Sequence, residues 1–438
     1  MKWLGAAWIV FVAAVYCPDV GRGFIKDDFT WIRAAQSAAA EPITLIRQRD
    51  AGFYRPAVTL SFALDYGAHG WKPRGYGWTN LALYVFCALA VVLLALALGL
   101  SPSIGLLAAF LWTANPHGVN MAIVWVSGRT ATLLTLFGVL AAAAFLLRWY
   151  VGTALLLACA LLSKEEAVAL PFILLTWALI RDGGERPRWP AIAAVTLPLL
   201  AYGILRALTP AMTPATAPSF YRLTADPLLV TRNIGEYLDR SATLTAAAVV
   251  LAAIAYGAVP RIDAGDRRLL LLMGVWWLGM FAITIWLPVR SSLYAVCPSV
   301  AAAIAGAVLI DRMRAAAARP RVPLEIVLAG LLVIAIPLYQ RRDDLRAEAA
   351  RVSQRTLNAI ESDLPGLPHV GVVVLHEDPE GRVFHEAFGD LATEALRTRF
   401  GREWDARIDD DTAASGRGGV IADYWIRHGT LSRVRPRL

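Results

Sequence analysis

Long apolar runs separated by short polar loops make up most of the chain. Crossing the hydrocarbon core of a bilayer takes about 20 predominantly apolar residues, and several runs reach that length. The pattern predicts an all-α multi-pass membrane protein with about 11 transmembrane helices, whose bounds are accurate to about two to four residues. These predicted segments cover residues 3–19, 77–99, 103–118, 130–147, 150–163, 166–180, 189–207, 241–259, 269–287, 292–310 and 322–339.

The composition agrees with a membrane class. The chain is 57% hydrophobic and only 17% charged, with a mean hydropathy of +0.53, whereas soluble proteins contain about 25% charged residues. The net charge of +8 does not indicate a nucleic-acid partner, because the Arg residues lie mainly in short loops between apolar runs. The first run lacks a clear cleavage site and is expected to remain as a helix. The four cysteines show no metal-ligand spacing.

Basic residues in short loops predict the orientation. Cytoplasmic short loops are enriched in Lys and Arg, whereas long loops cross largely regardless of charge. If the N-terminus is cytoplasmic, the short loops with the most Lys and Arg residues lie inside and the long loop 19–76 lies outside. An odd number of helices also puts the C-terminus outside, and an even number reverses it. Because the chain is rich in Ala and Arg, we expect a bacterial inner membrane, with the outer side facing the periplasm. The basic residues used are Arg148, Arg181, Arg186, Arg188, Arg261, Arg267, Arg268, Arg312, Arg314, Arg319 and Arg321.

Residues 340–438 differ in character from the rest of the chain. A charged, helix-like stretch at 341–361 precedes the apolar run 369–375, which is typical of a buried strand. A second strand is predicted at 419–422. We therefore expect a transmembrane domain at 1–339 and a small soluble α/β domain at 340–438, of about 80 to 100 residues.

Unusual polar residues collect on the predicted outer side. Asp27 and Asp28 directly follow the first apolar run, and carboxylates beside a membrane helix are costly unless they have a function. Adjacent side chains point in different directions, so we expect only one of the two to face a substrate, and the sequence does not say which. The other members of this group are His117, Ser127, Arg129, Ser163, Lys164, Glu165, Glu166, Arg290 and Tyr294.

Each of these residues also has a structural interpretation. Asp28 can cap the helix that follows it, and Lys164 can form an ion pair with a neighbouring glutamate. Arg129 and Arg290 can anchor to lipid headgroups or snorkel to the interface. His117 can be an ordinary interface histidine.

Taken together, the polar residues favour group transfer. A carboxylate can act as general base toward a hydroxyl acceptor, and Arg and Lys can hold an anionic leaving group such as a phosphate. Apolar helices around such a site suit a donor with a lipid tail. Two carboxylates could also bind a divalent metal ion, although the sequence contains no complete ligand set.

Several segments, in order and spacing, resemble the GT-C superfamily of multi-pass glycosyltransferases that use polyprenyl-phosphate sugars. The resemblance is greatest to the membrane half of the transmembrane-and-TPR proteins and to the protein O-mannosyltransferases. Asn115-Pro116-His117-Gly118 departs from the family pattern, and the TPR array is absent. The matching segments are Asp27-Asp28-Phe29, Tyr54-Arg55-Pro56 with Leu60-Ser61-Phe62, Trp125-Val126-Ser127-Gly128-Arg129, Leu162-Ser163-Lys164-Glu165, and Arg290 through Tyr294 to Pro298-Ser299.

The resemblance implies inverting transfer of a hexose from a polyprenyl phosphate to a hydroxyl acceptor at the outer face of the membrane. Asp27 or Asp28 would be the general base. The acceptor would be a protein, a lipid or a glycan. The donor and its phosphate would be bound by Arg55, Arg129, Lys164, Glu165, Arg290 and Tyr294, with Glu165 orienting Lys164 or a substrate hydroxyl.

Other functions remain as alternatives. A transporter or flippase of lipid-linked sugars would need polar residues near helix centres and a repeat of two halves, but the helix centres consist almost entirely of Ala, Leu and Val. A scaffold with a periplasmic domain would not need the polar group. An enzyme similar to an O-antigen ligase or polymerase would typically carry a large Arg-rich periplasmic loop late in the chain.

Overall fold

Helices account for 74% of the computed structural model of the chain. The structure describes residues 2–47, 52–181, 183–185, 187–213, 216–317, 323–377, 382–409, 420–427 and 430–434. The basic residues Arg186, Arg319 and Arg321, and Gly419 at the start of the second predicted strand, lie outside these ranges.

Each predicted apolar run contains a helix. Local signals mark several starts: Pro73 and Pro102 occupy first-turn positions, where a missing N–H costs nothing, and Asp263 forms a capping box with Asp266. The helices are α1 (Lys2–Val15), α4 (Pro73–Ala97), α5 (Pro102–Thr113), α7 (Arg129–Leu146), α8 (Tyr150–Leu161), α9 (Leu170–Arg181), α10 (Trp189–Ala207), α11 (Pro227–Tyr256), α12 (Ala264–Phe281), α13 (Ser299–Ala316) and α14 (Leu324–Asp363).

The length of these helices bears on the number of membrane spans. Among the described residues, four helical segments are long and apolar enough to cross a membrane by length and composition: Pro73–Ala97, Val126–Leu146, Trp189–Ala207 and Pro227–Tyr256. Shorter apolar helices cover Trp3–Val15, Pro102–Thr113 and Tyr150–Leu161. A membrane protein is thus supported, but the predicted count of about 11 spans is not confirmed.

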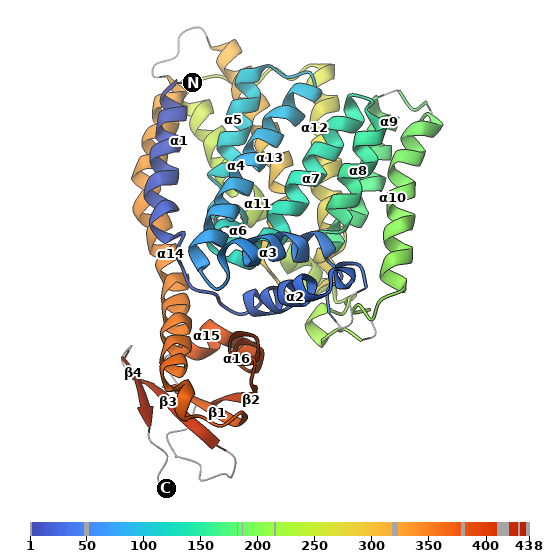
Figure 1. Cartoon of the computed structure of the whole chain (residues 1–438). Helices are drawn as coiled ribbons and strands as arrows, with labels where there is room; N and C mark the ends of the chain where they lie inside the picture. Colours follow the sequence, from blue (N-terminus) through green and yellow to red (C-terminus); the bar gives the residue numbers. More distant parts are fainter. Residues whose placement is uncertain are drawn as a thin grey trace.

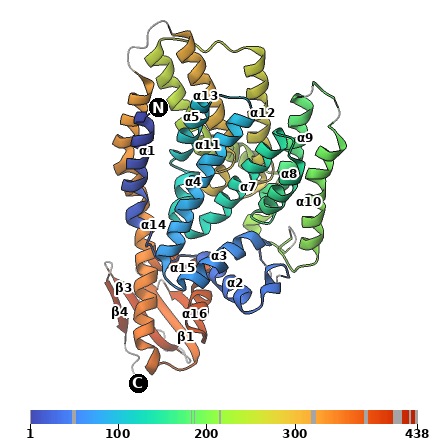
Figure 2. The ribbon, with the colours of Figure 1, turned by 45° about the horizontal axis from the view of Figure 1, so that its top comes forward.

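The apolar helices stand side by side in a bundle, and α1 packs along α14 at one flank (Figure 1). Two helices outside the predicted apolar runs, α2 (Asp28–Ala40) and α3 (Pro56–His69), lie across one end of the bundle. A helix after Asp28 was one interpretation of the sequence, whereas α3 was not predicted. A short helix, α6 (Gly118–Val124), follows α5. The rotated view in Figure 2 keeps α2 and α3 at the same end, next to the C-terminal sheet.

The C-terminal sheet has the strand order β2-β1-β3-β4. The first strand, β1 (Val370–Glu377), matches the predicted strand and pairs in parallel with β2 (Glu403–Asp409) and β3 (Val420–Arg427). The last strand, β4 (Thr430–Val434), is antiparallel to β3. Two helices, α15 (Val383–Phe388) and α16 (Ala392–Phe400), connect β1 to β2.

One hydrophobic core joins the C-terminal elements to the helices across the bundle end. It contains Phe29 of α2, Phe62 of α3, Phe388 of α15 and Trp404 of β2, all buried. The predicted domain boundary at residue 340 falls inside α14, which continues from the bundle to the sheet. The division into two domains stays a prediction.

Candidate active site

The acidic pair lies where the chain enters α2, and its two side chains have opposite environments. Lys26 adopts a left-handed conformation, with φ of 46°. Asp28 is fully buried. Its Oδ2 accepts the Ile25 N–H (2.9 Å), while its Oδ1 accepts the Ser127 N–H (2.7 Å) and the Ser127 hydroxyl. Asp28 therefore ties this loop to the segment before α7.

Burial has a direct effect on the acidity of Asp28. It raises the pKa of the carboxyl to about 7, against the opposing effect of the hydrogen bonds from Ile25 and Ser127. Asp28 does not cap α2, because it is the first residue of that helix. Its carboxylate instead accepts hydrogen bonds from the backbone N–H groups of Ile25 and Ser127.

Asp27 is the accessible member of the pair. Its side chain makes no cap hydrogen bond to α2, and the residue is exposed. The carboxyl nevertheless lies in a recess among protein atoms, so that burial raises its pKa, while the positive charges of Arg55 and Lys26 lower it by less. A carboxylate that reaches solvent and has a raised pKa is suited to accept a proton.

Beside Asp27 is an open pocket with about 770 Å³ of empty space. Arg55 and Tyr221 belong to its wall, and both interact electrostatically with Asp27. The pocket combines charged and apolar walls. Its residues are Phe53, Arg55, Glu165, Glu166, Arg206, Met212, Thr213, Ala217, Tyr221, Leu223, Ile283, Thr284, Leu287 and Tyr294.

Glu165 joins two arginines on the charged wall. Its Oε2 accepts from Arg55 Nη2 (2.6 Å) and Nε (2.9 Å), and its Oε1 lies 3.7 Å from Arg206 Nη1. Burial acts to raise the pKa of Glu165, but the charge and hydrogen bonds of Arg55 outweigh it, and the pKa is lowered. The carboxylate stays ionised and leaves the wall with one net positive charge from these three groups.

A third cation, paired with Glu166, lies beneath the pocket wall. Lys164 Nζ is 2.8 Å from Glu166 Oε1 and 4.7 Å from the centre of the Tyr294 ring. Lys164 is almost completely buried, whereas Glu166 and Tyr294 face the pocket. The structure thus brings Asp27, Arg55, Lys164, Glu165 and Tyr294 to one place.

Arg129 lies away from the pocket wall, inside the bundle. It is fully buried, and its Nη2 is 2.6 Å from Asp65 Oδ2. Its remaining N–H groups donate to Asn80 Oδ1, to Ser61 Oγ and carbonyl, and to the Tyr76 carbonyl. A guanidinium with this many internal partners favours the structural interpretation over contact with a phosphate.

Arg290 belongs to a neighbouring cluster. Its Nη1 lies 2.6 Å from Glu236 Oε1, and the same carboxylate pairs with Arg232 and Arg240 of α11. Tyr237 separates this cluster from the pocket, because its ring packs edge-on against Tyr294 at 6.3 Å. Arg290 therefore lies next to the pocket without lining it.

Sequence reasoning missed Arg206 and Tyr221 as wall residues. Arg206 lies in the last turn of α10. Because α10 begins at a basic loop on the predicted inner side, the predicted orientation puts its C-terminal end, and therefore Arg206, on the outer side with Asp27. The basic loop before α10 was therefore a sequence signal for the side on which Arg206 lies. Tyr221 lies in an irregular connection before α11, where no periodicity indicates direction.

Among the described residues, no group of three or more His, Cys, Asp or Glu side chains could hold a metal ion.

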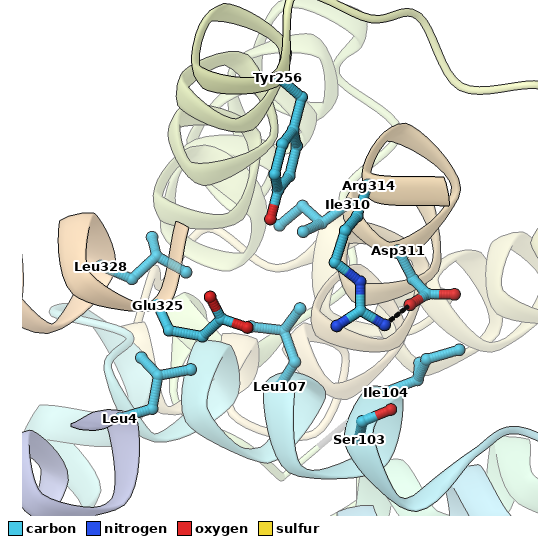
Figure 3. A pocket seen from close by; sticks show the side chains of 10 residues that line it. All are labelled: Leu4, Ser103, Ile104, Leu107, Tyr256, Ile310, Asp311, Arg314, Glu325 and Leu328. Carbon is cyan, nitrogen blue, oxygen red and sulfur yellow. Dashed lines mark hydrogen bonds and ion pairs between the residues drawn. The ribbon is translucent and has the colours of Figure 1, made fainter. Parts of the chain in front are cut away.

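Another pocket lies at the opposite end of the bundle, where Glu325 and Tyr256 approach an ion pair between Arg314 and Asp311 (2.7 Å) (Figure 3). It is remote from Asp27.

No family model and no curated protein matches the chain. Two solved structures are similar: the archaeal oligosaccharyltransferase AglB from Archaeoglobus fulgidus in complex with an inhibitory peptide and a dolichol-phosphate, and an Archaeoglobus fulgidus oligosaccharyltransferase tethered to an acceptor peptide containing the NVT sequon.

Both are 12% identical to the chain, with TM-scores of 0.48 and 0.47. The matches cover 93% and 88% of this chain but 64% and 62% of the neighbours. The chain thus spans less than two thirds of their length. The narrower resemblance to transmembrane-and-TPR proteins is not confirmed.

Proposed function

We propose that the chain is a membrane glycosyltransferase that moves a hexose from a polyprenyl-phosphate donor to a hydroxyl acceptor. In this proposal Asp27 is the general base, and the site faces the outer side of a bacterial inner membrane. The observation that carries the proposal is the position of Asp27, an accessible carboxylate next to a pocket whose wall combines apolar side chains with two arginines, Arg55 and Arg206.

The pocket suits the two parts of such a donor. The side chains of Phe53, Leu223 and Leu287 provide apolar surface for the first units of a lipid chain. Arg55 and Arg206 face the same space. Guanidinium groups match phosphate oxygens with a fork of N–H donors. Lys164 adds a positive charge behind Tyr294.

The reaction follows from this arrangement. Asp27 accepts the proton of the acceptor hydroxyl as its oxygen forms a bond to the anomeric carbon of the hexose. The bond from that carbon to the phosphate oxygen breaks, and the polyprenyl phosphate leaves with the electron pair. Arg55 and Arg206 stabilise the charge that develops on the leaving phosphate. Attack from the face opposite to the leaving group inverts the anomeric configuration.

The test uses membranes that contain the full chain and are supplied with a polyprenyl-phosphate hexose and a hydroxyl acceptor. Asp27→Asn cannot accept the proton, and we expect kcat to fall by about 10²- to 10⁴-fold with an unchanged KM for the donor. Arg206→Ala should instead raise the donor KM. Asp239→Asn, an exposed aspartate that pairs with Thr243, is the matched control. Full transfer by the Asp27 variant would contradict the proposal.

A further inference from the structure

The segment that carries Asp27 is held by the C-terminal part of the chain. Lys26 donates its backbone N–H to the Ala387 carbonyl of α15 at 2.9 Å. Its Nζ lies 2.9 Å from Glu386 Oε2. The φ of 46° at Lys26 lies in a region that residues with a side chain rarely adopt. These two contacts therefore hold a conformation that the segment would not keep by itself.

Packing around the segment comes from the same C-terminal elements. The Phe29 ring stacks on Phe388 of α15, with centroids 5.8 Å apart and planes inclined by 23°. On the other side, α14 approaches so closely that a Cβ on Gly23 would lie 2.5 Å from the Ala350 carbonyl oxygen. Ile25 is buried against the same part of α14. The segment before α2 is thus enclosed by α14 and α15.

The left-handed turn at Lys26 determines how the acidic pair is divided. It turns the chain so that Asp28 faces inward, to the Ile25 and Ser127 N–H groups, and Asp27 stays outside, near Arg55. We propose that the C-terminal elements act as a positioning device for Asp27, with the Lys26–Glu386 pair as its latch. This inference rests on the proposed function, in which Asp27 is the base.

The latch residues are positioning residues and touch no substrate. They are 360 positions apart in the sequence, so Asp27 is ordered only when the C-terminal elements are docked on the bundle. In the full chain, Glu386→Lys places a second ammonium group against that of Lys26, and the two repel each other. We expect kcat to fall by about 10- to 100-fold at an unchanged donor KM. The charge swap of Lys26→Glu with Glu386→Lys should restore most of kcat, which a general loss of folding would not allow.

Hydrogen exchange gives a readout that is independent of sugar transfer. In the full chain without donor, we expect faster exchange of the peptide 24–29 in Glu386→Lys and recovery in the charge swap. Glu403→Lys, at an exposed position at the start of β2, is the control for the same charge change. If the peptide 24–29 exchanged at the wild-type rate in Glu386→Lys, the proposal that the Lys26–Glu386 pair holds this segment would be overturned.

The two failures can be told apart. Faster exchange with an unchanged kcat would overturn the catalytic role of the latch. If Asp27→Asn were then also fully active, the assignment of the base would be the error. If Asp27→Asn were inactive, the base would stand and the latch would not control it.

Discussion

At Asp27 and Asp28, two neighbouring carboxyl groups differ in almost every physical respect. One is exposed beside Arg55, and the other is buried with three hydrogen-bond donors from Ile25 and Ser127. The sequence predicts that only one of the pair faces a substrate, because adjacent side chains diverge. It cannot predict which one, because the choice depends on Lys26, whose left-handed conformation is stabilised by a contact from residue 387.

The acidity of Asp28 predicts a pH dependence of stability. Burial raises its pKa from the ordinary 3.8 to about 7, so between these values the folded protein keeps a proton that the unfolded chain has lost. The resulting stabilisation is fully present below about pH 4 and is lost as the pH rises through about 7, by up to about 1.4 kcal/mol per pH unit. Asp28→Asn does not titrate. The stability advantage of the wild type over Asp28→Asn should therefore shrink between pH 5 and pH 8.

Melting temperatures in detergent at the two pH values provide this measurement. Glu403→Gln, at an exposed position on the sheet, should show no comparable change. If the stability advantage of the wild type over Asp28→Asn grew with pH, the hydrogen bonds from Ile25 and Ser127 would be keeping the Asp28 carboxylate charged. The pKa of Asp28 in the folded protein would then lie below the ordinary 3.8.

At the scale of elements, Arg129 joins three helices. It stands at the start of α7, pairs with Asp65 of α3 and donates to Asn80 and Tyr76 of α4. The Trp125–Arg129 motif marked this residue in the sequence, but a motif does not say whether a guanidinium faces a ligand or the interior. The deciding partner, Asp65, lies in a helix that the sequence did not predict, within the long loop 19–76.

Removal of Arg129 should therefore affect stability first. Arg129→Met leaves the buried Asp65 carboxylate without its cation, which costs about 3–5 kcal/mol in such pairs. Adding Asp65→Asn removes the stranded charge, so the double variant should be less destabilised than the sum of the two single variants. Thermal melting in detergent measures both effects. A normal melting temperature with a raised donor KM would instead indicate that Arg129 binds the donor.

Predictability differs between the elements. The apolar periodicity located α4, α7 and α10 to within a few residues, because burial in a bilayer or a bundle needs little beyond an apolar sequence. The apolar runs did not include α2 and α3, which carry polar residues and lie across the bundle end, where they share a core with α15 and α16. Contacts between distant parts of the chain decide such elements, and a single sequence does not show them.

Across the whole molecule, the basic loops used to predict the orientation and the candidate site lie at opposite ends of the bundle. Arg267, Arg268 and Arg312 lie at the end where α12 begins and α13 closes, and Arg312 pairs with Asp266 there. The α2 helix, which Asp27 directly precedes, lies at the other end, beside the C-terminal elements (Figure 1). The enrichment of Lys and Arg in cytoplasmic short loops then predicts that the arginine end is cytoplasmic and that the site and the sheet are both outside.

Single cysteines test this orientation in a chain whose half-buried Cys17 and Cys159 are replaced by alanine. A membrane-impermeant maleimide applied to intact cells should label Ser219→Cys near the pocket and Glu403→Cys on the sheet, both at exposed positions. Arg268→Cys, also exposed, should react only after permeabilisation. The reversed pattern would put the pocket in the cytoplasm and exclude transfer at the outer face. Labelling of Ser219→Cys and Glu403→Cys from opposite sides would contradict the shared core of Phe29 and Phe388, because two surfaces packed against each other cannot lie across a bilayer.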